Sequence, residues 1–393
     1  MTTLSAFTLR GRTLLPIVQG GMGIGISAHR LAGTVARAGA VGTIASIDLR
    51  HHHADLSEHA KRCRDKDELN RLNLIALDRE INAALELAEG HGLVAVNVMK
   101  AVDAHPAYVR QACASGAQAI VMGAGLPLDL PELTEAYPDV ALIPILSDAR
   151  GVAIVLKKWA RLNKFGSGGR LPDAIVIEHP LYAGGHLGAP NPADLANPRF
   201  DVAEVLPGIF KVFDDMGIAR GQIPIIVGGG INSHEKLRAV LALGAAAAQI
   251  GTPFAVTAEG DAHPDFKRVL AEAKPEDIVT FMSVAGLPAR AVNTPWLANY
   301  LKREPRLQAC AKAHPDRCAI GLHCLTQCGL RDGLEKAGQF CIDSQLVAAL
   351  KGDVNKGLFF RGSEPVPFGS AIRPVRELID YLLTGVKPDA LRV

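Results

Sequence analysis

The stretch PIIVGGGINSHEKLRAVLALGAAAAQIGTPFAVT, residues 224–257, decides the fold because it contains two apolar strands separated by one helix. The apolar runs are PIIVGGGI (224–231) and AAAQIGTPFAVT (246–257). Between them, SHEKLRAVLALGA (233–245) has the spacing of an amphipathic helix. This arrangement predicts a right-handed βαβ unit with parallel strands.

The same alternation extends back to residue 14. We predict six earlier strands, at 14–22, 40–46, 93–99, 118–125, 140–147 and 173–178. We predict helices at 27–39, 65–90, 105–116, 130–138, 151–166 and 201–217. We predict Ser27 as the N-cap of the first of these helices. The strands are apolar throughout, as expected for parallel strands buried on both faces.

Eight such units close most simply into a (β/α)8 TIM barrel. The alternative is an open doubly wound sheet, but its GxGxxG turn is missing because GGMGIG (20–25) has the wrong spacing. The alternation stops near residue 258. We therefore predict a barrel over residues 1–257 and an appended, mainly helical C-terminal segment over 258–393.

Composition narrows the class of protein. The 393 residues are 48% hydrophobic and 21% charged, with a net charge of +2, so no basic face for nucleic acid is indicated. No apolar run approaches the ~20 residues that span a bilayer. The N-terminus lacks a signal-peptide pattern, and we expect a cytoplasmic protein with no membrane partner.

Glycines at the predicted strand ends indicate a ligand site. Gly228, Gly229 and Gly230 end the seventh strand, and Gly251 and Thr252 end the eighth. Phosphate sites of (β/α)8 barrels usually form at these two strand ends, where free backbone N–H groups favour an anion. The sixth strand runs into Gly184-Gly185-His186, a turn that brings backbone and one imidazole close to a ligand.

Several motifs together resemble the nitronate monooxygenase family, formerly called 2-nitropropane dioxygenase. They are IVQGGMGIGIS, VNVM, GAGLP, IVIEHPLYAGGHLG, PIIVGGGI, AQIGTPFAVTAE and GLPARAVN, spread over residues 14–295. The family includes FMN-dependent enoyl-ACP reductases and NAD(P)H:quinone reductases. The resemblance implies a (β/α)8 barrel that holds FMN non-covalently.

The resemblance also assigns residues to the cofactor. Gln19, Gly20 and Met22 would lie near the flavin ring, and Asn97 would contact its polar edge. The remaining cofactor-binding positions are Gly184, Gly185, Gly228, Gly229, Gly230, Gln249, Gly251 and Thr252, of which Gly229, Gly230, Gly251 and Thr252 would hold the phosphate.

His186 matches the family's active-site histidine, which acts as general base or as polar anchor for the substrate. A neutral imidazole suits both roles at physiological pH. Many members have a Glu-Ala-Gly-Gly-His turn, whereas this chain has Tyr182 at the Glu position. This departure leaves the substrate open.

Five of the seven cysteines fall between residues 310 and 341. Cys318, Cys324, Cys328 and Cys341 could hold a [4Fe–4S] cluster or, as a second choice, zinc, with Cys310 left over. The spacing differs from the CxxC pairs of zinc ribbons. The third interpretation is that these are free thiols packed as small apolar side chains.

We expect an FMN-dependent oxidoreductase, and specifically a nitronate monooxygenase that oxidises alkyl nitronates with O2. One alternative is an NAD(P)H-dependent reductase of quinones or enoyl thioesters. Others are a flavin and iron–sulfur redox sensor or electron-transfer partner, and a phosphate-binding aldolase or synthase without flavin. The sequence leaves the physiological substrate, the electron donor and the oligomeric state open, a homodimer being one option.

Overall fold

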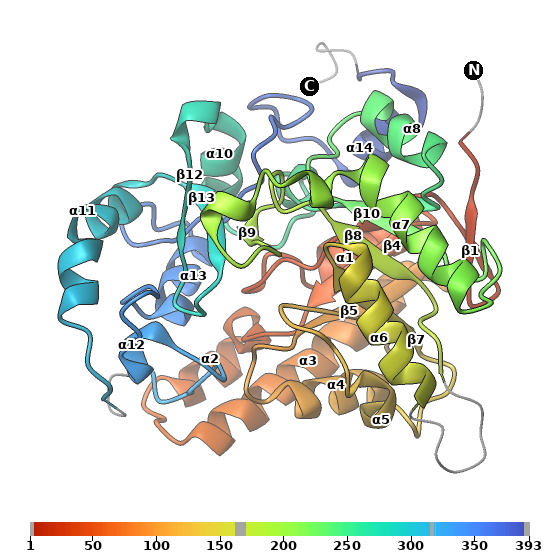
Figure 1. Cartoon of the computed structure of the whole chain (residues 1–393). Helices are drawn as coiled ribbons and strands as arrows, with labels where there is room; N and C mark the ends of the chain where they lie inside the picture. The colour runs from red at the N-terminus through yellow and green to blue at the C-terminus, as the bar shows by residue number, and fades with distance from the viewer. Residues whose placement is uncertain (1–3, 162–169, 315–317, 319, 389–393) are drawn as a thin grey trace.

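A closed barrel of eight parallel strands forms the centre of the computed structural model, which describes residues 4–161, 170–314, 318 and 320–388 (Figure 1). The strands around the barrel are β10 (Ile225–Gly228), β11 (Ala247–Ile250), β3 (Ile17–Gln19), β4 (Val41–Ala45), β5 (Leu93–Met99), β6 (Ala119–Gly123), β7 (Ala141–Leu146) and β8 (Ile175–Glu178). Each lies within a predicted strand, so the predicted (β/α)8 barrel is confirmed.

Both faces of every barrel strand are buried, which explains the continuous apolar runs. In β5, Leu93 and Ala95 pack inside the barrel, whereas Val94, Val96 and Val98 pack against the outer helices. Alternate residues of a strand point to opposite faces. The inside is filled mainly by Val, Ile, Leu and Ala side chains from all eight strands, so it is a packed core and not a pore.

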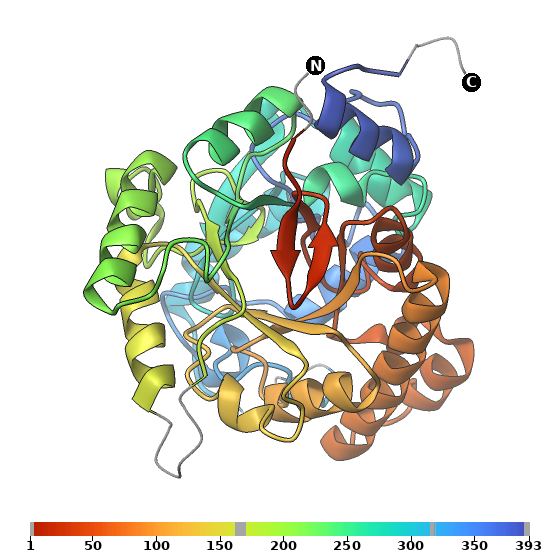
Figure 2. The ribbon, with the colours of Figure 1, turned by 90° about the vertical axis from the view of Figure 1, so that its right-hand side faces the viewer.

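Helices surround the barrel (Figure 2). They are α1 (His29–Arg37), α2 (Ala54–Ala60), α3 (Lys66–Ala88), α4 (His105–Ala114), α5 (Leu130–Leu133), α6 (Ala149–Arg161), α7 (Val202–Asp215) and α8 (His234–Ala242). Short 3-10 helices occupy Leu49–His52, Pro192–Asp194, Pro198–Phe200 and Pro275–Asp277. The predicted helix 151–166 corresponds to α6, and its last five residues lie outside the described part of the chain.

Helix α1 is capped differently from the prediction. Its N-cap residue is Ala28, and the hydroxyl of Ser27 instead accepts a hydrogen bond from the Met22 N–H at 2.9 Å. The carboxylate of Asp261 accepts from the N–H groups of Ala28 at 2.8 Å and Leu31 at 3.2 Å. A side chain distant in sequence thus supplies the cap that Ser27 was predicted to provide.

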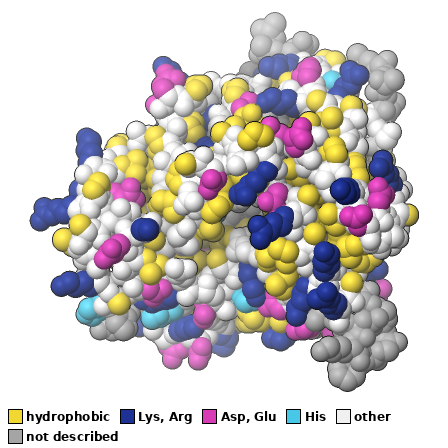
Figure 3. Space-filling view, in the orientation of Figure 1, with side chains coloured by type: hydrophobic (Ala, Val, Ile, Leu, Met, Phe, Trp, Pro, Cys, Tyr) yellow, Lys and Arg dark blue, Asp and Glu magenta, His cyan; other side chains and the backbone are white. Residues whose placement is uncertain are grey.

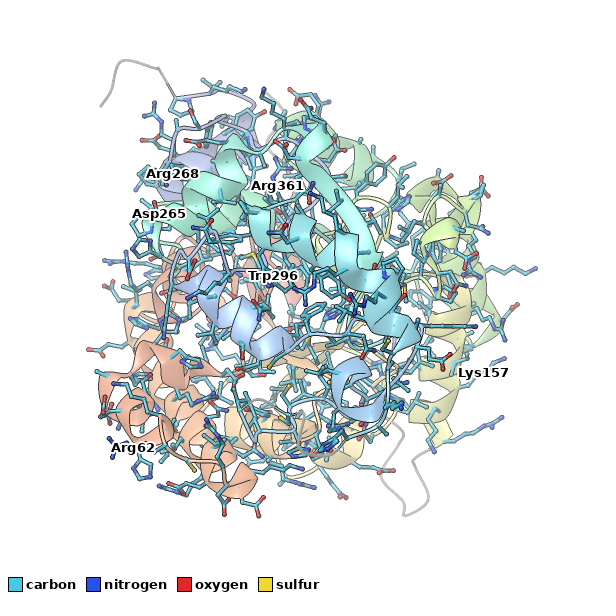
Figure 4. All side chains as sticks on the ribbon, turned by 90° about the vertical axis from the view of Figure 1, so that its left-hand side faces the viewer. Arg62, Lys157, Asp265, Arg268, Trp296 and Arg361 are labelled. Atoms are coloured by element: carbon cyan, nitrogen blue, oxygen red, sulfur yellow. The ribbon has the colours of Figure 1, made fainter. Side chains whose placement is uncertain are left out.

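The C-terminal segment covers one end of the barrel (Figures 1 and 4). Its helices are α10 (Pro264–Glu272), α11 (Pro295–Ala309), α12 (Gly329–Asp332), α13 (Ile342–Leu350) and α14 (Val375–Thr384), whereas the short α9 (Thr252–Ala255) directly follows the last barrel strand. It also contains two strands that the sequence did not predict, β12 (Ile278–Met282) and β13 (Pro288–Val292). These form an antiparallel sheet with β9 (Gly185–His186), a strand from the barrel's own loop.

Helix α14 belongs to the ring of helices around the barrel. It contacts α8 and α1, and its Val375, Leu378, Ile379 and Leu382 are part of the main hydrophobic core. The division into a barrel to residue 257 and a segment from 258 stays a prediction, since the segment both covers the barrel and contributes to its outer ring.

The opposite end of the barrel is closed by an antiparallel hairpin of β1 (Phe7–Leu9) and β2 (Arg12–Leu14), which lies across the centre of Figure 2. Phe7, Leu9 and Leu14 pack with the barrel interior. Acidic and basic side chains are interspersed over the face drawn in Figure 3. Within the described ranges, no helix combines the length and the apolarity needed to cross a membrane.

Candidate active site

A cavity of about 580 Å³ lies at the carboxyl ends of the barrel strands, beneath the C-terminal segment. This size is within the usual range for small-molecule sites. Eleven of the predicted site residues line it: His186, Gly20, Met22, Asn97, Gly184, Gly185, Gly229, Gly230, Gln249, Gly251 and Thr252. The cavity thus brings together residues spread over more than 230 positions of the sequence.

The floor of the cavity is the last inward-facing layer of the barrel. Asn97, Glu178 and Gln249 each stand two residues after a side chain that packs inside the barrel, namely Ala95, Val176 and Ala247. By the alternation of a strand, their side chains also point inward. The floor is therefore polar, in contrast to the apolar core below it.

Glycines beside this layer make room for a flat ligand. A Cβ atom added to Gly21 would lie 2.3 Å from the Cβ of Asn97, and one added to Gly20 would lie 3.3 Å from the Cγ of Gln249. Any side chain at Gly21 would therefore collide with the floor. The floor is thus a polar surface bordered by the bare backbone of Gly20 and Gly21.

The predicted phosphate region lies at the ends of β10 and β11. Gly229 and Gly230 have φ angles of 97° and 74°, a left-handed conformation that favours glycine. Added Cβ atoms there would lie 2.7 Å from the His179 carbonyl oxygen and 2.8 Å from the Tyr182 Cβ. Both positions thus require glycine, and their bare backbone faces the cavity.

His186 is held by the small sheet that the C-terminal segment completes. Strand β13 pairs Ala289 with His186 and Arg290 with Gly185. The guanidinium of Arg290 donates to the carbonyl oxygens of Pro180 and Ala183, which fixes the loop before the Gly-Gly turn. The turn is tight, because a Cβ atom on Gly184 would lie 2.5 Å from the Arg361 backbone.

The imidazole of His186 is neutral at physiological pH. Burial lowers its pKa to about 4. Its ring lies edge-on to Phe360, with 5.5 Å between ring centroids. The Nε2 atom is buried and has no hydrogen-bond partner among the described residues. A ligand in the cavity can supply that partner.

Glu178 is a site residue that the sequence interpretation missed. It lines the cavity, it makes no hydrogen bond or ion pair to another described side chain, and burial raises its pKa to about 7. One signal was present in the sequence: Glu178 ends an apolar strand in phase with the inward-facing Ala174 and Val176. A carboxyl group in that phase must face the site.

Two predicted cofactor residues lie outside the cavity lining. The Gln19 side chain is fully buried between strands, where it donates to the Thr43 carbonyl at 3.1 Å and accepts from the Thr43 N–H at 2.8 Å. Gln19 therefore links β3 to β4 instead of lining the cavity. Gly228 is within β10, one residue before the cavity begins.

The four cysteines predicted as metal ligands lie near one another: besides burial, the neighbouring Cys328 and Cys341 raise the pKa of Cys324, and Cys318 raises that of Cys341. Cys324 lines the cavity, and burial raises its pKa well above the usual value, which favours the thiol. Cys318 accepts from the His323 N–H at 3.3 Å, Cys341 accepts from the Ser344 hydroxyl at 3.3 Å, and Cys328 precedes α12. Within the described part of the chain, no group of three or more His, Cys, Asp or Glu residues is placed to hold a metal ion. The structure does not support the predicted metal site.

Beside this cysteine-rich stretch lies a buried charged cluster. Asp48, which is fully buried, pairs with Arg50 and accepts from Asn73 at 2.8 Å. Asp343 of α13 lies against this cluster, and burial and the nearby Asp48 hold its pKa well above the usual range. The cluster thus joins the C-terminal segment to the loop after β4.

The fold and the cavity define a (β/α)8 barrel with a small-molecule site at the carboxyl ends of its strands. The sequence profile of the nitronate monooxygenase family matches residues 8–385. The chain belongs to this family.

Individual relatives share only about 30% sequence identity with this chain, and over less than a third of its length. A probable nitronate monooxygenase of Bacillus subtilis is 31% identical over 123 residues, which are 31% of this chain and 33% of that protein. A nitronate monooxygenase of Pseudomonas aeruginosa is 30% identical over 120 residues, 30% of this chain and 31% of that protein. The matches therefore span about a third of each relative.

Solved structures share the fold over nearly the whole chain. FabK from Thermotoga maritima has a TM-score of 0.62 at 21% identity, covering 94% of this chain and 91% of that chain. A nitroalkane oxidase from Streptomyces ansochromogenes has a TM-score of 0.59 at 20% identity, covering 94% of both chains. These likenesses support the barrel and its covering segment.

Proposed function

We propose that the protein is an FMN-dependent oxidoreductase that oxidises alkyl nitronates with O2. The observation that carries the proposal is the neutral imidazole of His186, with an unpaired buried nitrogen, in the same cavity as the glycines predicted to bind the cofactor. Membership of the nitronate monooxygenase family supports the same activity.

The residues present fit FMN. The bare backbone at Gly229, Gly230 and Gly251, with Thr252, would hold the phosphate. Asn97 and Gln249 would hydrogen-bond the polar edge of the ring on the floor of the cavity. The flavin, when bound, supplies the electron transfer between substrate and O2.

His186 would anchor the substrate. A base with a pKa of about 4 removes a proton from a neutral nitroalkane inefficiently, because its conjugate acid is too strong. As a neutral imidazole it can still donate a hydrogen bond to a nitronate oxygen, if the proton is on Nε2. We therefore favour the anchor role over the general-base role, and the nitronate over its parent nitroalkane as substrate.

The test uses the purified protein. Flavin absorption bands, and FMN in the supernatant after denaturation, are expected, together with nitronate-dependent O2 uptake. His186→Ala should lower kcat/KM for the nitronate by roughly 10- to 150-fold, the loss of a hydrogen bond to a charged group. His91→Ala, at an exposed histidine, is the matched control. A colourless protein, or equal rates for both variants, would refute the proposal.

Two other proposals are tested on the same sample. Bleaching of the flavin by NADH or NADPH without O2 would favour the quinone or enoyl-thioester reductase. The iron–sulfur cluster is a proposal that the cysteine spacing alone supports, and iron analysis after anaerobic purification tests it. If the analysis finds neither iron nor zinc, the cluster proposal is wrong and the five cysteines are free thiols.

A further inference from the structure

We infer that residues 361–365 form a strap that controls the entry and release of the cofactor, and that the ion pair between Lys236 and Glu364 is its latch. This inference rests on the proposed function, because it takes FMN as the ligand of the phosphate region. It adds a step that the proposed function does not contain: the strap must lift before FMN can bind or leave.

The strap crosses the proposed phosphate region. The Gly362 N–H donates to the Thr252 hydroxyl at 3.0 Å, and the Ser363 N–H donates to the Tyr182 carbonyl oxygen at 3.2 Å. The strap residues that line the cavity are Arg361, Gly362, Glu364 and Pro365. The strap therefore covers the groups that would hold the phosphate.

The first residue of the strap is firmly held. The Arg361 guanidinium, labelled in Figure 4, is buried and donates to the carbonyl oxygens of Leu270 at 2.9 Å and Gly362 at 3.1 Å. The Arg361 N–H also donates to the Arg290 carbonyl oxygen at 3.4 Å. Breaking hydrogen bonds of a buried charged group is costly, because water does not replace them. This end of the strap therefore acts as the hinge.

The other end of the strap is held by partly exposed groups. Lys236 of α8 pairs with Glu364 and donates to the Gly230 carbonyl oxygen at 3.0 Å. The two charged side chains are 44% and 28% exposed. The Asn232 side chain donates to the Pro365 carbonyl oxygen at 2.7 Å, also near the surface. Water can replace these bonds at little cost, so the strap opens from the α8 end.

The latch lies within the chain and is separate from the cofactor contacts. Lys236 is outside the described cavity lining, and its ammonium bonds only connect α8 to the strap and to Gly230. The strap must open both when FMN binds and when it leaves. A weaker latch should therefore raise the association and dissociation rates by the same factor and leave Kd nearly unchanged.

Two variants test the latch. Lys236→Met and Glu364→Gln should each raise both rates about 1.5- to 5-fold, the range for a partly exposed ion pair. Stopped-flow fluorescence of apoprotein mixed with FMN measures association. Release from the holoenzyme is measured with an excess of an unrelated apoflavoprotein that captures free FMN. Lys356→Met is the matched control, because Lys356 lies 3.8 Å from Asp353 outside the cavity lining, and its rates should be unchanged.

The direction of each effect separates a latch from a simple charge effect. If Glu364 only repelled the phosphate, Glu364→Gln would slow FMN release. If Lys236 only attracted the phosphate, Lys236→Met would slow FMN association. As a latch, both variants accelerate both steps. The double variant should exchange FMN no faster than either single variant, because all three lack the same ion pair.

The outcomes also separate this inference from the proposed function. A protein that binds FMN but oxidises no nitronate refutes the proposed function and leaves the latch standing. Slower release from Glu364→Gln, additive effects in the double variant, or rates equal to those of the unchanged protein overturn the latch and leave the proposed function standing. A protein that binds no FMN refutes both.

Discussion

The Thr252 hydroxyl accepts a hydrogen bond from the Gly362 N–H at 3.0 Å. Thr252 follows the last barrel strand, and Gly362 belongs to the loop that covers the cavity from the C-terminal segment. The bond therefore connects the proposed phosphate region to its cover. In the proposed function, the Thr252 side chain would serve both the cofactor and the closure of the site.

Thr252→Val should weaken FMN binding, because it removes the hydroxyl and keeps the shape. Loss of one hydrogen bond to a charged phosphate corresponds to an increase in Kd of roughly 10- to 150-fold. Fluorescence titration of the apoprotein with FMN measures this Kd. Thr384→Val, at an exposed threonine of α14, is the control, and an unchanged Kd in Thr252→Val would contradict the assignment.

Gly21→Ala should also weaken FMN binding, since its methyl group would lie 2.3 Å from the Cβ of Asn97 and displace that side chain. Overpacking of this kind costs about 1–3 kcal/mol, a 5- to 150-fold rise in Kd. Gly151→Ala is the matched control, because Gly151 lines the same cavity and a Cβ atom added there would meet nothing closer than 3.4 Å. Equal affinities for the two variants would show that Asn97 does not support the ring.

Activity toward nitronates should fall as pH rises through about 7. Burial raises the pKa of Glu178 to about 7, so its carboxyl group is neutral below that pH and anionic above it. An anionic group in the cavity repels the anionic nitronate. Initial rates with freshly prepared nitronate give the profile, which should become flat in Glu178→Gln. The same fall in the Gln variant would assign the titration to another group.

Arg50→Ala should destabilise the fold by about 3–5 kcal/mol, because it leaves the fully buried Asp48 carboxylate without its cation. Urea unfolding followed by circular dichroism measures the change. Arg79→Ala is the control: Arg79 pairs with Asp55 on the surface, and its loss should leave the unfolding midpoint nearly unchanged. Similar midpoints for both variants would show that the Asp48 cluster does not hold the segment in place.

The barrel was predictable because its signal is local. Each parallel strand is a short apolar run that ends in glycine or a polar residue, and each of the eight runs became a barrel strand. The cavity-lining glycines were predictable for the same reason, since strand ends of a barrel share one face. Asn97 and Gln249 also lie on that face, as predicted.

The remaining features depend on contacts between distant residues. Strands β12 and β13 pair with the two-residue β9, a pairing that no local pattern indicates. Asp261 caps α1 in place of Ser27 for the same reason. The Gln19 side chain, at a strand end, bridges β3 and β4 through Thr43, a contact that the local sequence does not indicate.

Helix α14 has a consequence for synthesis of the protein. It fills the place between α8 and α1, yet residues 375–384 leave the ribosome after every barrel strand. Until then the apolar flanks of those two helices stay open to water on the nascent chain. Such surfaces recruit chaperones or aggregate. During synthesis, α14 can therefore dock between α8 and α1 only after all eight barrel strands have been made.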